Sequence, residues 1–143
     1  QGGVALGYYP ETFVRSLHEE MDAAIRAAGG RVDGWLYCPH HPQAADPLTR
    51  TDCACRKPKP GLIDQARARH EIDLARSFVI GDRRTDVQLA EAVGAQGILV
   101  RTGYGEEQLT RHGANLPAGT HVAANLAEAA AWILHDTAGA EAS

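Results

Sequence analysis

Hydrophobic and polar residues alternate along the chain with two different periods, which predict helices and strands in turn. Between Pro10 and Gly30 the apolar residues recur every four positions, as expected for an amphipathic helix: Phe13, Leu17, Met21 and Ile25. Short apolar runs that end at glycine or polar residues are typical of buried strands. Such strands are predicted at 34–37, 77–80, 97–100 and 120–123.

Helices are expected between these strands. One is predicted over about 61–70, a second starts at Thr85 and ends at Gly94, and a third is capped by Asn125 and continues to Leu134. The glycine-rich residues 1–9 are predicted to form a loop. Strands that alternate with helices of about 10 to 15 residues predict an open α/β parallel sheet with helices on both faces. In such sheets, ligands bind at the carboxyl ends of the strands.

Length and composition limit the possible classes of protein. With 143 residues, 44% apolar and 22% charged, the chain is expected to form a single domain over 1–136, followed by a frayed tail over 137–143. The net charge of −4 argues against nucleic-acid or membrane binding, both of which need a positive surface. No apolar run approaches the ~18 to 20 residues of a membrane span. We therefore expect a cytoplasmic protein that binds neither nucleic acid nor a membrane.

All three cysteines lie within 18 residues of one another and form one candidate metal site. Cys38, Cys53 and Cys55 together with His40 make a Cys₃His set, which suits tetrahedral zinc. His41 is an alternative ligand to His40, and three reduced thiols without a metal are the simpler alternative. Disulfides are disfavoured because the number of cysteines is odd and a Cys53–Cys55 pair would be strained.

Two aspartates follow the predicted strand at 77–80. Asp82 comes directly after it, at the edge of the sheet where ligands bind, and its carboxylate is a suitable magnesium ligand. Asp86 lies four residues further on, in the first turn of the next helix. It either faces the same crevice as Asp82 or only stabilises the N-terminus of that helix.

Several motifs resemble those of the haloacid dehalogenase (HAD) superfamily. The segment 78–86, Phe-Val-Ile-Gly-Asp-Arg-Arg-Thr-Asp, resembles its fourth motif, and Lys57 in Cys-Arg-Lys-Pro resembles its third-motif lysine. The Cys-Pro-His-His-Pro and Cys-x-Cys-Arg-Lys-Pro segments, with 99–103, are similar to the D-glycero-D-manno-heptose 1,7-bisphosphate 7-phosphatases. Histidinol-phosphate phosphatases are close relatives. The twelve residues between His40 and Cys53 favour the heptose branch.

This resemblance implies a magnesium-dependent phosphatase that removes the 7-phosphate of a sugar bisphosphate through an aspartyl-phosphate. Lys57 would hold the transferring phosphoryl group and Asp82 would bind Mg²⁺. Asp86 would support the magnesium ligands without binding the metal itself. The expected substrate contacts are Gln1, Gly2, Arg56, Lys57 and Arg83. The expected ligands of a structural zinc are Cys38, His40, Cys53 and Cys55. The alternatives are a histidinol-phosphate phosphatase and an inactive, zinc-stabilised anion-binding fragment.

The chain departs from the family pattern at its start. The family's Asp-x-Asp-Gly-Thr segment, which carries the nucleophile and the acid/base aspartate, does not occur in the sequence, and Leu6 stands where an arginine is expected. We therefore expect a chain without its N-terminal strands, inactive alone, whose sheet has unpaired apolar edges. A missing N-terminal segment or a neighbouring copy would complete the sheet. The loop Arg101–Gly105 is a further candidate for the lining of the pocket.

Overall fold

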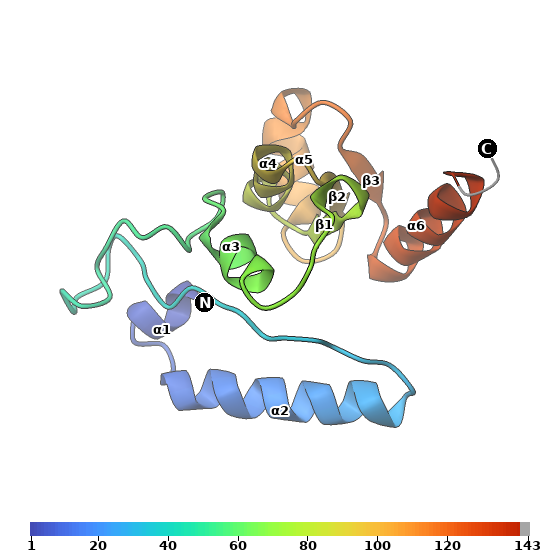
Figure 1. Ribbon diagram of the computed structural model, residues 1–143. Helices are drawn as coiled ribbons and strands as arrows, with labels where there is room; N and C mark the ends of the chain where they lie inside the picture. Colours follow the sequence, from blue (N-terminus) through green and yellow to red (C-terminus); the bar gives the residue numbers. More distant parts are fainter. Residues whose placement is uncertain (141–143) are drawn as a thin grey trace. The chain divides into compact units, whose positions relative to one another are not determined.

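The computed structural model describes residues 1–140, which form two compact units (Figure 1). The first consists of residues 1–56 and 61–71, and the second consists of residues 57–60 and those from 72 onward. Each unit is described by itself. The tail predicted over 137–143 lies partly in the last helix, which reaches Ala140, and partly outside the described residues.

The first unit contains three helices, α1 (Gly2–Ala5), α2 (Glu11–Ala27) and α3 (Gly61–Arg67). Helix α2 is the predicted amphipathic helix, and it begins directly after Pro10, whose extended backbone precedes the first turn. Helix α1 corrects the prediction of a loop over 1–9. Its few backbone hydrogen bonds, such as Leu6 N–H to Gly2 C=O at 3.0 Å, close a single turn.

The strand predicted at 34–37 is wrong, because this segment has no strand partner in the described part of the chain. Its side chains pack on α2 instead. The Trp35 ring stacks on His18 with centroids 4.7 Å apart, and the Tyr37 hydroxyl donates a hydrogen bond to Glu11 Oε1 at 2.5 Å. An apolar run predicts a strand only if a neighbouring edge accepts its backbone hydrogen bonds, and the sequence does not specify that edge.

The second unit is built on a parallel sheet in the order β1-β2-β3 (Figure 1). The strands are β1 (Phe78–Gly81), β2 (Gln96–Val100) and β3 (His121–Ala123). Ile80 is paired with Ile98, and Leu99 with Val122. Three of the four predicted strands are therefore confirmed within one or two residues.

Helices cover both faces of this sheet, as predicted. Helix α4 (Arg84–Val93) contacts β1 and β2, and Gly97 faces its Val87 and Ala90 side chains. The opposite face carries Ile98 and Val100, which pack with Ala129, Trp132 and Ile133 of α6 (Leu126–Ala140). Because alternate residues of a strand point to opposite faces, α4 and α6 lie on different sides of β2.

The residues predicted to end or cap two helices occupy those positions in the structure. Gly94 ends α4 in the left-handed conformation with φ 74°, which glycine adopts without strain. Asn125 Oδ1 accepts a hydrogen bond from Glu128 N–H at 3.0 Å at the start of α6. The short helices η1 (Leu74–Arg76), α5 (Gly105–His112) and η2 (Gly113–Asn115) were not predicted.

Strand β1 is an edge strand of the described sheet, since β2 is the one strand that pairs with it there. Its apolar residues Phe78, Val79 and Ile80 are each only partly buried. The described sheet therefore ends at β1 in a partly exposed apolar strand. No helix in the described residues combines the length and the apolar character needed to cross a membrane.

Candidate metal centre and phosphate site

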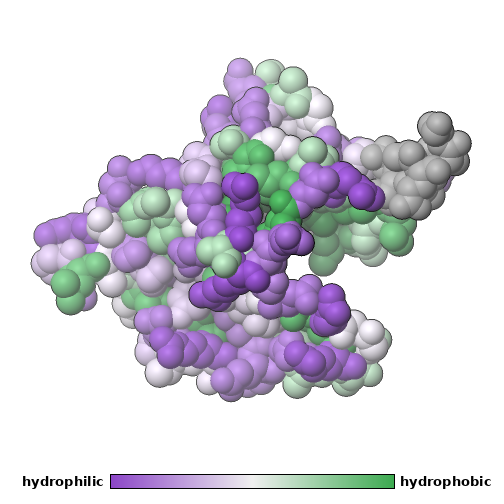
Figure 2. All heavy atoms as spheres, viewed as in Figure 1, coloured by the Kyte–Doolittle hydropathy of each residue, from purple (hydrophilic) through white to green (hydrophobic). Residues whose placement is uncertain are grey.

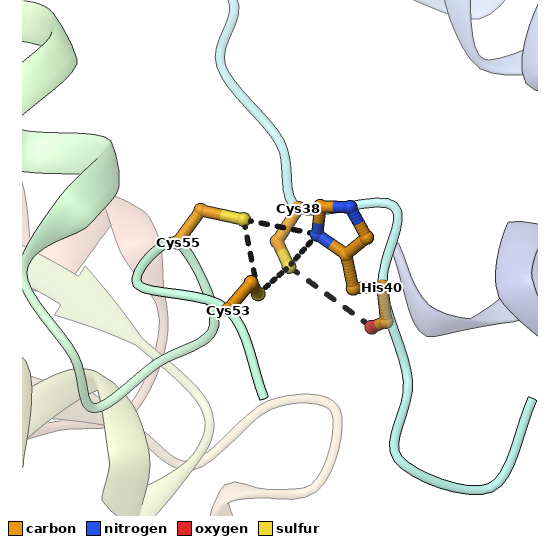
Figure 3. A group of neighbouring side chains, drawn as sticks. All are labelled: Cys38, His40, Cys53 and Cys55. Atoms are coloured by element: carbon orange, nitrogen blue, oxygen red, sulfur yellow. Dashed lines mark hydrogen bonds between the residues drawn. The ribbon is translucent and has the colours of Figure 1, made fainter. Parts of the chain in front are cut away.

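Three thiols and one imidazole converge in the first unit, as Figure 3 shows. The Sγ atom of Cys53 lies 3.3 Å from that of Cys38 and 3.2 Å from that of Cys55, and His40 Nδ1 lies 3.3 Å from Cys55 Sγ. All four potential ligand atoms lie within 4.8 Å of one another. A zinc tetrahedron with bonds of about 2.0 to 2.3 Å separates its ligand atoms by about 3.5 to 3.8 Å. The cluster therefore has nearly the size that a single zinc ion requires.

The structure brings His40 to the cluster, whereas His41 points its ring nitrogen elsewhere. His41 Nδ1 accepts a hydrogen bond from Gln43 N–H at 3.1 Å. The loop that joins the two ligand pairs, 41–52, is closed by a hydrogen bond from His41 N–H to Thr49 C=O at 3.0 Å. Leu48 in this loop is 85% exposed, and a hydrophobic patch lies over the loop at the left of Figure 2.

The close packing of the thiols gives Cys53 and Cys55 different pKa values. Burial, the largest single effect at Cys53, raises the pKa of its thiol. Hydrogen bonds from Cys55, Cys38 and His40 together outweigh burial and lower this pKa from 9.0 to about 6. At Cys55, burial and then the neighbouring thiols Cys38 and Cys53 raise the pKa to about 12. Of these two thiols, Cys53 is therefore the one that loses its proton more readily, and the thiolate is the form that binds a metal.

Arg56 is attached to the backbone of this cluster. Its guanidinium Nη1 donates a hydrogen bond to the carbonyl oxygen of His40 at 3.1 Å. Gly2 is also near, since a side-chain carbon at Gly2 would lie 3.6 Å from Arg56 Nη1 and 3.1 Å from the His41 ring. Gln1 Oε1 accepts a hydrogen bond from the Tyr9 hydroxyl at 2.9 Å. Gly2 and Arg56, two of the predicted substrate contacts, therefore lie together in the first unit.

Lys57 and Asp86 form an ion pair in the second unit, at the carboxyl end of β1. The other carboxylate oxygen of Asp86, Oδ2, accepts a hydrogen bond from Arg83 N–H at 3.0 Å and so closes the first turn of α4. Asp86 is 4% exposed, and the absence of a side chain at Gly81 leaves room for its carboxylate. Asp86 thus both stabilises the N-terminus of the helix and holds the lysine.

Asp82 is held by a different partner. Its Oδ2 accepts a hydrogen bond from the main-chain N–H of Tyr104 at 3.0 Å. The neighbouring Arg83 guanidinium lies over the Tyr104 ring, 3.9 Å from its centroid. The sequence identified the loop 101–105, which includes Tyr104, but not the contacts of Tyr104 with Asp82 and Arg83. The only signal available was an aromatic residue in a glycine-rich turn after a strand.

Comparison with known proteins identifies the family. A family model described as HAD-hydrolase-like matches residues 54–129. The D-glycero-beta-D-manno-heptose-1,7-bisphosphate 7-phosphatase of Neisseria meningitidis serogroup A is 34% identical over 142 residues, which cover 99% of this chain and 72% of the relative. The protein of the same name from Pseudomonas putida is 39% identical over 111 residues, which cover 78% of this chain and 59% of the relative.

A solved structure has the same fold. The D,D-heptose 1,7-bisphosphate phosphatase from B. bronchiseptica, complexed with magnesium and phosphate, superposes with a TM-score of 0.82 at 35% identity. The match covers 95% of this chain and 71% of that one. The resemblance seen in the sequence motifs is thereby confirmed, and the chain belongs to the HAD-hydrolase-like family, among the relatives named heptose bisphosphate phosphatases.

Proposed function

We propose that this chain carries the phosphate-binding part of a magnesium-dependent HAD phosphatase that acts on a heptose 1,7-bisphosphate and removes its 7-phosphate. The observation that carries the proposal is the Lys57–Asp86 ion pair at the carboxyl end of β1, the strand that ends next to Asp82. This arrangement combines a fixed ammonium for the phosphoryl oxygens with a carboxylate for a divalent cation. The names of the relatives support the choice of substrate.

Asp82 would hold the magnesium ion, which when bound neutralises charge on the transferring phosphoryl group. Carboxylate oxygen is the donor that Mg²⁺ prefers, so the residue fits this role. Lys57 orients the phosphoryl oxygens, and its partner Asp86 keeps the ammonium at the edge of the sheet. In the first unit, Arg56, Gln1 and Gly2 are proposed substrate contacts, as the resemblance implies. In the second unit, Arg83 is a further one, and the guanidinium fork of each arginine suits an anionic group.

We also propose that the Cys₃His cluster binds zinc in a structural role. Four protein ligands fill a tetrahedral site and leave no position for an activated water. The hydrogen bond from Arg56 to His40 C=O gives this ion a function, because a fixed loop keeps the guanidinium in place. A cytoplasmic location agrees with this assignment, since free thiols persist in a reducing compartment.

The nucleophile has to come from outside these residues, since the sequence contains no Asp-x-Asp pair. We propose that a segment with the family's Asp-x-Asp-Gly-Thr motif supplies the nucleophile and completes the sheet. A neighbouring copy of this chain would complete the sheet without supplying the nucleophile, because it has the same sequence. The free edge of β1 is where a further parallel strand can pair. The isolated chain is accordingly expected to be inactive.

The proposal can be tested with a fusion that places the N-terminal motif of the B. bronchiseptica relative ahead of Gln1. We expect the fusion to release phosphate from the 7-position of heptose 1,7-bisphosphate in the presence of Mg²⁺, and the 143-residue chain alone to release none. Histidinol phosphate serves as the comparison substrate. A fusion that is folded and zinc-loaded but prefers histidinol phosphate, or releases nothing, would contradict the proposal.

A further inference from the structure

The loop after β2 turns back over Asp82. Gly103 has φ +63°, a conformation that favours glycine, and a side-chain carbon at this position would overlap Asp82 Oδ2. The next residue, Tyr104, donates its main-chain N–H to that same oxygen at 3.0 Å. The turn therefore fixes one oxygen of the carboxylate through backbone atoms.

The side chain of Tyr104 holds the neighbouring residue of the site. The Arg83 guanidinium carbon lies 3.9 Å from the centre of the ring, within the range of a cation–π interaction. Arg83 is exposed and Tyr104 is 51% exposed, so the stacked pair is open to solvent on one side. An arginine that is already held in one orientation loses less freedom when it binds an anion.

Backbone hydrogen bonds and an ion pair close the loop that carries Tyr104. Gly105 N–H donates to Thr102 C=O at 3.1 Å, and Glu106 N–H donates to Arg101 C=O at 3.2 Å. The Arg101 and Glu106 side chains add an exposed ion pair at 2.9 Å. Tyr104 therefore projects from a closed turn at the start of α5.

We propose that Tyr104 is a positioning residue of the phosphate site. Its main-chain N–H orients the Asp82 carboxylate for the cation. Its ring holds the Arg83 guanidinium in the orientation that binds a second anionic group of the substrate, the phosphate that does not react. The inference rests on the proposed function and deepens it. It assigns selectivity for a bisphosphate over a monophosphate to the Arg83–Tyr104 pair. The binding of the cation by Asp82 depends instead on the backbone of the turn.

The ring can be tested with Tyr104→Ala and Tyr104→Phe in the full 143-residue chain, with Tyr8→Ala as the control at a tyrosine that is 76% exposed. The probes are fructose 1,6-bisphosphate and fructose 6-phosphate, titrated by calorimetry with Mg²⁺ present. We expect Tyr104→Ala to weaken bisphosphate binding about fivefold and monophosphate binding less than twofold. Tyr104→Phe, which keeps the aromatic face, should restore wild-type affinity.

The backbone contribution can be tested with a pair of glycine substitutions. Gly103→Ala and Gly119→Ala both place a methyl group at positive φ, but only the first meets Asp82, since nothing lies within 4 Å of a side-chain carbon at Gly119. With Mn²⁺ as the probe, we expect Gly103→Ala to weaken binding about tenfold. Gly119→Ala and Tyr104→Ala should both leave it within twofold.

The NMR signal of Arg83 Nε–Hε separates this inference from the proposed function. If the wild-type chain binds neither probe sugar nor Mn²⁺, phosphate release by the fusion still decides the proposed function, and the Arg83 signal still tests the role of the ring. Tyr104→Ala should shift it and Tyr104→Phe should not. An unchanged signal in Tyr104→Ala, equal losses for bisphosphate and monophosphate, or no rescue by phenylalanine would each overturn the positioning role.

Discussion

The Arg56 guanidinium donates a hydrogen bond to the carbonyl oxygen of His40, 3.1 Å away. A predicted anion-binding side chain is thereby tied to the backbone of a predicted metal ligand. Arg56 and Lys57 are consecutive in the sequence, and the metal loop precedes them directly. A change in the metal cluster should therefore affect the binding of phosphate without any change in the phosphate-binding residues themselves.

Loss of one ligand should abolish tight zinc binding. Cys55→Ser is expected to lower zinc affinity at least about 100-fold, because even partners outside the ligand shell cost 10- to 100-fold. His41→Ala is the matched control and should retain the metal, since His41 Nδ1 bonds to Gln43 N–H. Competition titrations with Co²⁺, whose thiolate absorption reports the bound state, measure both variants. Equal losses in the two variants would show that His40 is not the fourth ligand.

The thiols of the metal-free chain should react unequally. The pKa of Cys53 is lowered to about 6, so its thiolate dominates at pH 7 and is largely protonated at pH 5. The pKa of Cys55 is raised to about 12, so this residue stays a thiol at both pH values. Iodoacetamide should therefore label Cys53 at least about ten times faster than Cys55 at pH 7, and more slowly at pH 5.

Mass spectrometry of proteolytic peptides identifies the labelled residue. Added zinc should protect both thiols, because a metal-bound thiolate is shielded from the reagent. Faster labelling of Cys55 at neutral pH would contradict the assigned acidities.

Removal of the charge on Asp86 should destabilise the second unit. Asp86→Asn keeps the size of the side chain but breaks the ion pair with Lys57. The side chain of Lys57 is 43% exposed. The expected loss in the free energy of unfolding is about 1 to 2 kcal/mol, at the low end for buried charged hydrogen bonds because the lysine reaches solvent. Urea unfolding at constant zinc concentration measures it.

Glu107→Gln provides the control for this substitution. Its ion pair with Arg111 at 2.9 Å is exposed on both sides, so its loss should change stability by less than about 0.5 kcal/mol. Similar effects from the two substitutions would mean that the burial of Asp86 has no energetic consequence.

Gly81 should not tolerate a side chain. A methyl group there would overlap the Asp86 carboxylate, so Gly81→Ala is expected to cost at least about 2 kcal/mol of stability and to displace Asp86. Nothing lies within 4 Å of a side-chain carbon at Gly113, which has a helical φ of −51°. Gly113→Ala should therefore be neutral or slightly stabilising. Thermal unfolding of both variants tests the difference, and a stable Gly81→Ala would refute the close approach.

Local signals in the sequence predicted much of the second unit. The apolar run that ends at Gly81 and Asp82 predicted β1, Gly94 ended α4, and Asn125 capped α6. These features depend on residues close together in the sequence. The wrong strand at 34–37 and the unpredicted α5 depended on partners elsewhere in the fold.

The same distinction holds for the site. The spacing of Cys38, His40, Cys53 and Cys55 was sufficient to predict their convergence, because each pair is local and a single loop joins the pairs. The partners of the aspartates were not predictable in this way. Lys57 meets Asp86 across 29 positions, and Tyr104 meets Asp82 across 22. Such pairings follow from the order of the strands in the sheet.

The most direct test of the central claim is magnesium-dependent phosphate release by the fusion that carries the N-terminal motif, measured with and without Lys57→Met. The account predicts release from heptose 1,7-bisphosphate by the unsubstituted fusion and a loss of at least about 100-fold in the variant, with zinc content unchanged. Equal rates in the two proteins would contradict the claim that Lys57 at the end of β1 holds the phosphoryl group.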